Sequence, residues 1–388
     1  MDSNSKLDAI DAPSLKLAQL QSILLNGPEN MAEGAKEKLH EAIVEDSLSF
    51  IYKQTCEKLG WKIDTEFLES MEAKNKKELE EFDEKMKAAE ELGELELTNL
   101  TIKKAIYYAK IGDKANAIKI YEETCDKKST TFNQKLDITF GLLHLAMFDM
   151  DTDLIQKQIQ KAEELVDRGG DWERRNRLKA YQMVWHTYKR DFQKASKLFQ
   201  ECISTFATPE LMPFSEFVQI GVIVCVLALE RGPLKEKIIN CPEVLEIIVE
   251  HPVLSTLLNS LYECKYSEFF KSLAATEQQY LKVNRYFLPH IRYYTREMRI
   301  KAYAQLLQSY RSLTLSSMAA SFGVSEDFID RELSRFVSNG RLFCVIDKVS
   351  GIVETNRPDQ KNAQYQQTIK QGDLLLNRIQ KLSRTINI

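Results

Sequence analysis

The sequence is poor in residues that interrupt helices, and it has no apolar segment long enough to cross a membrane. Its 388 residues include only 14 glycines and 9 prolines, and charged residues make up 28%. With abundant Leu, Lys, Glu, Gln and Ala, this composition is typical of a helical globular protein. The longest apolar run, residues 220–229, is about half as long as a membrane-spanning helix. We therefore interpret it as a buried helix and expect no membrane partner.

Cysteine pairs and a secretory leader are also missing. The seven cysteines are scattered, their number is odd, and no two form a CxxC pair. Residues 1–14 are polar and acidic, without a basic segment followed by an apolar one, so we expect no signal peptide. Reduced thiols and the lack of a signal peptide predict a location in the cytoplasm and the nucleus.

Motifs for catalysis and cofactor binding are absent from the sequence. The five histidines lie far apart, at His40, His144, His186, His251 and His290. No HExxH zinc motif, no GxxxxGK[ST] phosphate loop and no GxSxG nucleophile motif occurs. We therefore expect no enzymatic activity, no metal and no cofactor. A Cys–His pair built from distant residues stays open, because such a pair leaves no local signature.

A repeat of about 40 residues runs through the middle of the chain. Asp113, Asp151 and Asp191 are separated by 38 and 40 residues, and each follows one apolar helical pattern and precedes another. Aspartate suits such a turn because its carboxylate accepts a backbone N–H at the start of the next helix. Helical hairpins at this period predict a solenoid that resembles tetratricopeptide (TPR) repeats, since one hairpin cannot bury its own apolar face.

Two further helical segments precede the repeats. Residues 14–26 have the pattern of a short amphipathic helix that ends at Gly27 and Pro28. Residues 66–96 contain twelve Asp or Glu and five Lys, a net charge of −7. This segment is either a solvated helix with ion pairs four residues apart or an acidic docking surface for a basic partner.

The pattern changes after about residue 310 to that of a winged helix. A short helix ends at Gly323, Ser325 caps a second helix, and Asn339 with Gly340 ends it. Residues 342–347 and 352–355 then form a β-hairpin. After Pro358, a long helix carries apolar residues to the end of the chain. The sequence thus predicts an all-α protein: a helical-repeat solenoid, a winged helix with a small β-hairpin, and a C-terminal helix.

The winged helix and the last helix are the candidate partner-binding elements. The second winged-helix helix has a net charge of −2, which disfavours a phosphate backbone and indicates a protein partner. A β-hairpin offers an edge strand to another chain, and an apolar stripe near 3.5-residue spacing suits helix bundling. For each element, the alternative is that it packs against the rest of its own chain. The residues expected to contact partners are Arg341, Phe343, Val345, Ile369, Leu375, Leu376, Ile379, Leu382 and Ile386.

Helical repeats followed by a winged helix resemble the PCI family of scaffold proteins. Five long strings are similar to those of its 26S proteasome lid subunits. They are GGDWERRNRLK (169–179), RYYTREMRI (292–300), FIDRELSRF (328–336), DKVSGIVETNRPD (347–359) and GDLLLNRIQKLSR (372–384). In the string at 169–179, we expect Trp172 to pack between repeats at a solvated helix start. The alternative is that the arginines of this string form a basic contact for an acidic neighbour.

The resemblance implies a non-catalytic scaffold in the lid of the proteasome regulatory particle. Its partners would be other PCI lid subunits, through the winged helix and the C-terminal helix, and the repeats could reach the ATPase ring. The expected domains are an N-terminal helical segment (1–60), TPR-like repeats (61–190), a PCI domain (191–360, with its winged helix at 311–357) and a bundling helix (361–388). The alternatives are a scaffold of the COP9 signalosome and a winged-helix protein that binds nucleic acid.

Overall fold

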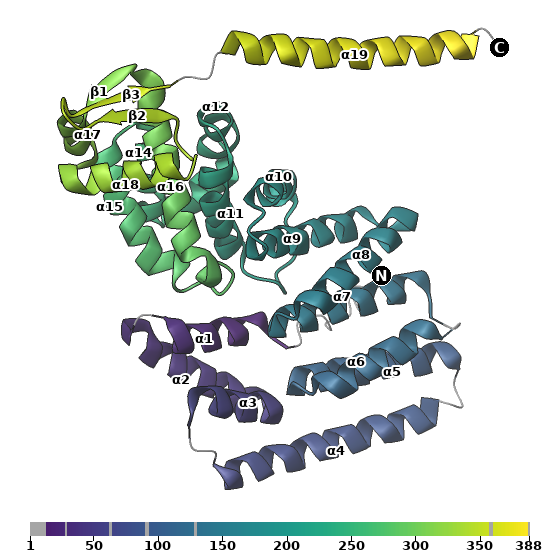
Figure 1. Cartoon of the computed structure of the whole chain (residues 1–388). Helices are drawn as coiled ribbons and strands as arrows, with labels where there is room; N and C mark the ends of the chain where they lie inside the picture. Colours follow the sequence, from purple (N-terminus) through teal and green to yellow (C-terminus); the bar gives the residue numbers. More distant parts are fainter. Residues whose placement is uncertain are drawn as a thin grey trace. The chain divides into compact units, whose positions relative to one another are not determined.

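A computed structural model describes residues 13–27, 29–61, 64–89, 93–127, 130–356 and 360–386. These residues belong to two compact units. The first comprises the chain up to Tyr262 together with Lys271–Thr295, and the second comprises Glu263–Phe270 together with Arg296 onward. Both units are helical, and the second adds a small sheet (Figure 1). In the part of the chain that is described, no helix is both long and apolar enough to cross a membrane.

The helices follow one another with short connections, as the low content of glycine and proline predicts. In chain order the α-helices are α1 (Leu15–Asn26), α2 (Glu29–Asp46), α3 (Ser49–Leu59), α4 (Thr65–Ala89), α5 (Glu94–Ile111), α6 (Lys114–Asp126), α7 (Phe132–Asp149), α8 (Thr152–Gly169), α9 (Trp172–Tyr188), α10 (Phe192–Cys202), α11 (Phe214–Ala228), α12 (Arg231–Leu234), α13 (Pro242–Ile248), α14 (Pro252–Glu263), α15 (Tyr266–Thr276), α16 (Ile291–Ser309), α17 (Leu315–Phe322), α18 (Glu326–Ser338) and α19 (Gln360–Ile386). Short 3-10 or π-helical turns are η1 (Ile203–Thr205), η2 (Lys235–Ile239), η3 (Glu277–Leu281) and η4 (Leu288–His290).

The three repeated aspartates cap helices, as predicted. The carboxylates of Asp113, Asp151 and Asp191 accept the backbone N–H of the third residue of α6, α8 and α10, at 3.2, 3.3 and 3.3 Å. The residue before each aspartate has a positive φ: 94° at Gly112, 57° at Met150 and 65° at Arg190. One left-handed residue and one cap therefore reverse the chain at each hairpin.

The hairpins stack into the predicted solenoid. Helices α5 and α6, α7 and α8, and α9 and α10 pack as antiparallel pairs, and α6 contacts α7 while α8 contacts α9 (Figure 1). An ion pair reinforces this stacking, since the Lys114 ammonium lies 3.3 Å from Asp149 and 3.1 Å from Asp151 of the next hairpin. Burial of one hairpin face by the next supplies the stability that a single hairpin lacks.

The apolar run at residues 220–229 lies in α11 up to Ala228, with Leu229 as the C-cap, and most of it is buried as predicted. Residues 220–226 are all buried. Gly221 faces the Phe199 ring of α10, which has no exposed surface. A Cβ on Gly221 would lie only 2.0 Å from Phe199 Cε2, so the close packing of α10 on α11 requires glycine here.

Helix α1 is anchored to distant parts of the first unit. Pro13 O accepts a hydrogen bond from His144 Nε2 of α7 (3.0 Å). The Gln19 amide donates to Val283 O (2.8 Å), and its oxygen accepts from the Arg285 N–H (3.2 Å). The amphipathic segment predicted at residues 14–26 therefore connects a repeat helix to the segment that leads into α16.

The acidic segment 66–96 forms parts of two helices. Helix α4 ends at Ala89 and α5 begins at Glu94. Met71 and Asn75 of α4 are buried, whereas most of its acidic residues are exposed. Within α4, Lys85 forms an ion pair with Glu81, four residues earlier, at 3.4 Å. Residues 90–92 lie outside the described residues. The described part of the segment is thus packed helix with a solvated acidic face, and its docking role stays a hypothesis.

The second unit contains the predicted winged helix, with one strand more than expected. Strands β1 (Ser312–Thr314), β3 (Ile352–Thr355) and β2 (Cys344–Asp347) form an antiparallel sheet in the order β1-β3-β2. Helices α17 and α18 precede the hairpin. Ser325 occupies the N-cap of α18 but makes no side-chain cap bond, so the predicted capping role is wrong in that detail. The Phe322 ring lies 4.7 Å from Tyr303 and 4.8 Å from Tyr266, between ring centroids, and forms the aromatic core.

The contact of Gly221 with Phe199 predicts a large effect for the substitution Gly221→Ala. The buried ring has no free space to enter, so we expect a loss of about 3 kcal/mol or more in the free energy of unfolding. Urea unfolding followed by circular dichroism measures this change. Gly34→Ala on α2 is the matched control, because a Cβ added at this position would have no neighbouring atom within 4 Å. The control should stabilise the protein by up to about 1 kcal/mol. Equal midpoints for both variants would contradict the packing.

Candidate protein-interaction site

Strand β2 of the winged helix has one buried and one exposed face. Leu342 and Cys344 are buried, whereas Phe343 and Val345 are 69% and 52% exposed. Val349 in the following turn is 99% exposed. Because β2 pairs only with β3, its other edge has no strand beside it in the described sheet. We call Arg341, Phe343, Val345 and Val349 the wing edge.

Arg341 has a partner within its own unit. Its guanidinium forms an ion pair with Glu297 of α16, and the Glu297 side chain is only 10% exposed. About half of the Arg341 side chain remains exposed. The structure therefore gives Arg341 a structural contact and leaves Phe343 and Val345 as the exposed apolar part of the wing edge.

The acidic residues of α18 divide into an internal and an external set. Glu332 forms an ion pair with Arg299 (2.8 Å) and accepts a hydrogen bond from the Tyr303 hydroxyl (3.0 Å). Glu326 and Asp327, in the first turn of the helix, are exposed. Their negative charge lies on the helix that would enter a DNA groove in a nucleic-acid-binding winged helix.

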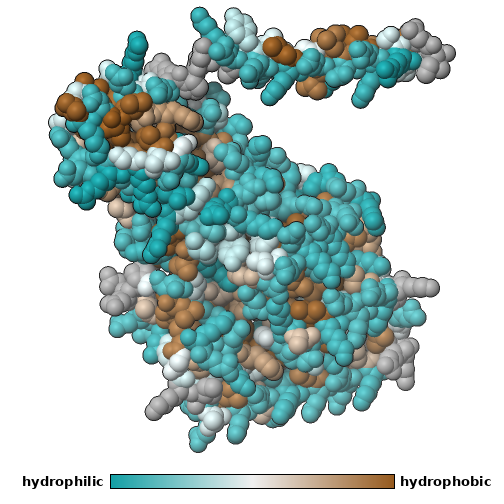
Figure 2. All heavy atoms as spheres, viewed as in Figure 1, coloured by the Kyte–Doolittle hydropathy of each residue, from teal (hydrophilic) through white to brown (hydrophobic). Residues whose placement is uncertain are grey.

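Helix α19 is exposed along its whole described length. Six of its apolar side chains form the C-terminal stripe, and each is between 53% and 72% exposed. The stripe consists of Ile369, Leu375, Leu376, Ile379, Leu382 and Ile386. At about 100° per residue these positions share one side of the helix, whereas Leu374, also exposed, lies on the other. Figure 2 shows apolar side chains along α19 and over the sheet of the second unit.

Within the described residues, no group of three or more His, Cys, Asp or Glu side chains could hold a metal ion. All seven cysteines are free thiols, and five of them are buried. Burial raises the pKa of the Cys202 thiol to about 12 and also raises the pKa of Cys344. These thiols are therefore poor nucleophiles at neutral pH.

Several histidines have structural partners. Nε2 of His290 lies 2.6 Å from Tyr188 O. In His251, Nε2 lies 2.9 Å from Gln219 Nε2 and Nδ1 lies 3.2 Å from the Tyr280 hydroxyl. His144 is fully buried, with Nδ1 3.1 Å from the Tyr181 hydroxyl. Because Pro13 O can only accept, Nε2 of His144 carries the proton and Nδ1 accepts from Tyr181.

Trp172 is not packed between repeats, so that expectation is wrong. It is 65% exposed at the first position of α9. The neighbouring Arg174 pairs with Asp137 of α7 at 3.1 Å and bonds Asn133 at 2.9 Å. Arg174 thus joins two repeat helices, whereas Trp172 is exposed to solvent.

Sequence reasoning missed three exposed apolar side chains near the expected site: Val349, Leu374 and Tyr365. The last two are 61% and 65% exposed on α19. Tyr365 lies one helical turn before Ile369, so its spacing could have added it to the stripe. Val349 gave no signal, because a single apolar residue in a turn has no periodicity.

Three family models match consecutive parts of the chain. The model described as 26S proteasome subunit RPN7 matches residues 64–237, and the PCI domain model matches residues 251–357. A third, described as the 26S proteasome regulatory subunit RPN7/PSMD6 C-terminal helix, matches residues 364–386. The winged helix and all but the first residues of α19 lie within matched regions.

Curated relatives are similar over most of the chain. The Arabidopsis thaliana "26S proteasome non-ATPase regulatory subunit 6 homolog" is 45% identical over 97% of this chain and 94% of its own length. The Schizosaccharomyces pombe "26S proteasome regulatory subunit rpn7" is 43% identical over 92% of each chain. The Saccharomyces cerevisiae "26S proteasome regulatory subunit RPN7" is 39% identical over 84% of this chain and 77% of its own.

The burial of His144 predicts a pH-dependent stability. Burial lowers its pKa to about 4 from 6.5, so below pH 6.5 the unfolded chain binds the proton more strongly than the folded one. The free energy of unfolding should therefore fall on acidification, by about 2 kcal/mol between pH 6.5 and 5. Urea unfolding at several pH values, compared with His144→Gln, isolates this contribution. Parallel pH profiles for both proteins would contradict it.

Proposed function

This chain belongs to the Rpn7 family of 26S proteasome regulatory subunits, also named non-ATPase subunit 6, and we propose that it is a non-catalytic scaffold of the regulatory-particle lid. In that role it supports degradation of ubiquitinated proteins through assembly with other subunits. The names of its relatives favour the proteasome over the signalosome. The exposed acids of α18 give no support to nucleic acid as a ligand.

One observation carries the proposal: the C-terminal stripe is exposed on a helix whose described side chains all face solvent. Burial of an apolar side chain contributes about 1.5–3 kcal/mol, so the six residues together offer about 10 kcal/mol before the entropic cost of association. A solitary amphipathic helix of this kind is stable only when its apolar side is covered. We propose that helices of neighbouring lid subunits cover it.

The wing edge is the second proposed contact. Its exposed side chains alternate with buried ones, so a strand added beside β2 would gain backbone hydrogen bonds and apolar contacts together. We propose that Phe343 and Val345 contact the PCI domain of an adjacent subunit. Arg341 contributes the part of its side chain that the Glu297 pair leaves exposed.

The domain limits and the outer contacts are also part of the proposal. We assign the N-terminal helical segment to residues 1–60, the repeats to 61–190, the PCI domain to 191–360 and the bundling helix to 361–388. The repeats would reach the ATPase ring, and the complex would work in the cytoplasm and the nucleus.

Substitution of Leu375→Asp together with Ile379→Asp should remove the chain from a complex of megadalton size. A charge on each side chain prevents burial of the stripe, whereas the fold is unaffected because both positions are exposed. The measurement is comigration of the tagged chain with proteasome particles in a density gradient.

Leu374→Asp is the matched control, because Leu374 is equally exposed but lies off the stripe. It should assemble normally, and Val345→Asp should weaken assembly through the wing edge. Full assembly of the double variant, or equal loss with Leu374→Asp, would argue against bundling through this stripe.

A further inference from the structure

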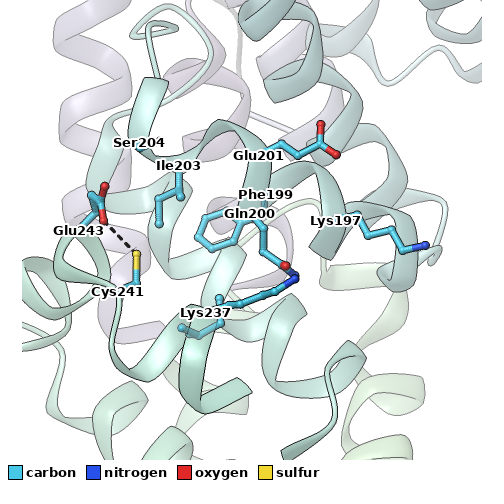
Figure 3. Close-up of a pocket in the computed structure, with 10 residues that line it drawn as sticks. Lys197, Phe199, Gln200, Glu201, Ile203, Ser204, Lys237, Cys241 and Glu243 are labelled. Carbon is cyan, nitrogen blue, oxygen red and sulfur yellow. Dashed lines mark hydrogen bonds between the residues drawn. The ribbon is translucent and has the colours of Figure 1, made fainter. Parts of the chain in front are cut away.

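A pocket on the first unit presents little accessible apolar surface. It has a volume of about 550 Å³ and lies between α10 with η1 and the segment from η2 to the start of α13 (Figure 3). Its apolar side chains, Phe199, Ile203 and Ile238, are buried in the packing of the chain. The Cys241 thiol already donates to the Glu243 carboxylate at 3.0 Å, the dashed line in Figure 3. Accessible apolar groups lie instead on α19.

Gly372 lies near the middle of α19, where the chain itself gives no reason for a glycine. After proline, glycine is the least favourable residue in a helix interior. Elsewhere it is required by a positive φ, as at Gly112, or by a close neighbour, as at Gly221. Gly372 is not among the residues with positive φ, and a Cβ added to it would have no atom of the described residues within 4 Å. A reason for this glycine therefore has to come from outside the chain.

Gly372 interrupts the C-terminal stripe. At about 100° per residue it lies within about 60° of Ile369, Leu375 and Leu376 around the helix. These three side chains, one turn before and one turn after it, are between 58% and 63% exposed. Because glycine has no side chain, the stripe has a notch here, about 10 Å long between Ile369 and Leu376. The notch is open to another molecule, since all the side chains described for α19 are exposed.

We propose that the notch at Gly372 receives a large apolar side chain, of the size of Leu or Phe, from the neighbouring lid-subunit helix that covers the stripe. This inference rests on the proposed function. When two helices pack, a side chain of one inserts into a hole formed by four residues of the other. A hole that includes glycine is deeper than the other holes of the stripe, so it fits a longer side chain.

The notch also determines how the neighbouring helix is placed along α19. Ile369, Leu375 and Leu376 hold the backbone of that helix at the usual distance between packed helices, so only a side chain can fill the space above Gly372. A helix shifted by one turn would leave this space empty and would place its large side chain against a leucine. Gly372 is therefore a specificity-determining residue of the stripe.

The substitution Gly372→Leu in the full-length chain tests the proposal. It fills the notch, yet it raises the helix propensity of α19 and the apolar area of the stripe. A stripe that only had to be apolar would assemble at least as well. We expect instead about tenfold less incorporation than for the wild type, because the neighbouring side chain has no space left. The measurement is the ratio of variant to wild type, tagged differently and expressed together, by mass spectrometry of the megadalton fraction.

Gly372→Ala and Asn377→Leu are the matched controls. Alanine adds one methyl group, so incorporation should stay within about threefold of the wild type. Asn377 is exposed and lies about 140° around the helix from Gly372, so the same leucine side chain there should have no effect. Normal incorporation of Gly372→Leu would overturn the proposal. So would an equal loss with Gly372→Ala, which would indicate a bend in the helix, or an equal loss with Asn377→Leu.

Two further comparisons separate this inference from other causes. Circular dichroism of the purified Gly372→Leu chain should show no loss of helix, so reduced incorporation would not be a failure to fold. Full assembly of the Leu375→Asp, Ile379→Asp variant would contradict the proposed function, and the notch with it. Loss of that variant together with normal incorporation of Gly372→Leu would contradict the notch alone.

Discussion

The fold depends on a turn that reverses the chain between two helices and satisfies the ends of both. At Asp113, Asp151 and Asp191 the backbone N–H donates to a carbonyl five residues earlier, at 3.0, 3.1 and 2.9 Å, which closes the first helix. The carboxylate of the same residue caps the next helix. A turn this short fixes how each hairpin packs, so successive hairpins can bury one another.

Interaction surfaces remain where the fold leaves apolar groups uncovered. The inner sides of the repeats and of α11 are buried by packing against one another. The buried His144 and the partly buried Arg285 also have hydrogen-bond partners within the chain. By contrast, the side chains of the C-terminal stripe and of the exposed face of β2 are more than half exposed within the described chain. A scaffold can thus keep its own stability separate from its assembly contacts, and substitutions at the two kinds of position should have different consequences.

Much of this architecture was predictable because it follows from local patterns. The turn aspartates, the buried run at residues 220–229, the hairpin of the wing and the last helix each have a periodicity or a cap that the sequence displays. Strand β1 has only three residues, Ser312–Thr314, too few to show an alternation, and it is defined by its pairing with β3. Contacts between residues far apart in the chain were not predictable from local patterns either. The pairs Arg174–Asp137 and Arg341–Glu297 join residues far apart in the chain, and the second gives Arg341 a partner within its own unit.

The exposed C-terminal stripe and the family membership lead to one central claim, that this chain works as a subunit of the proteasome regulatory particle. The most direct test is affinity purification of the tagged full-length chain at moderate salt, followed by quantitative mass spectrometry. We expect proteasomal ATPases and other lid subunits in amounts close to that of the chain itself. Recovery of the chain alone, or with signalosome subunits in their place, would contradict it.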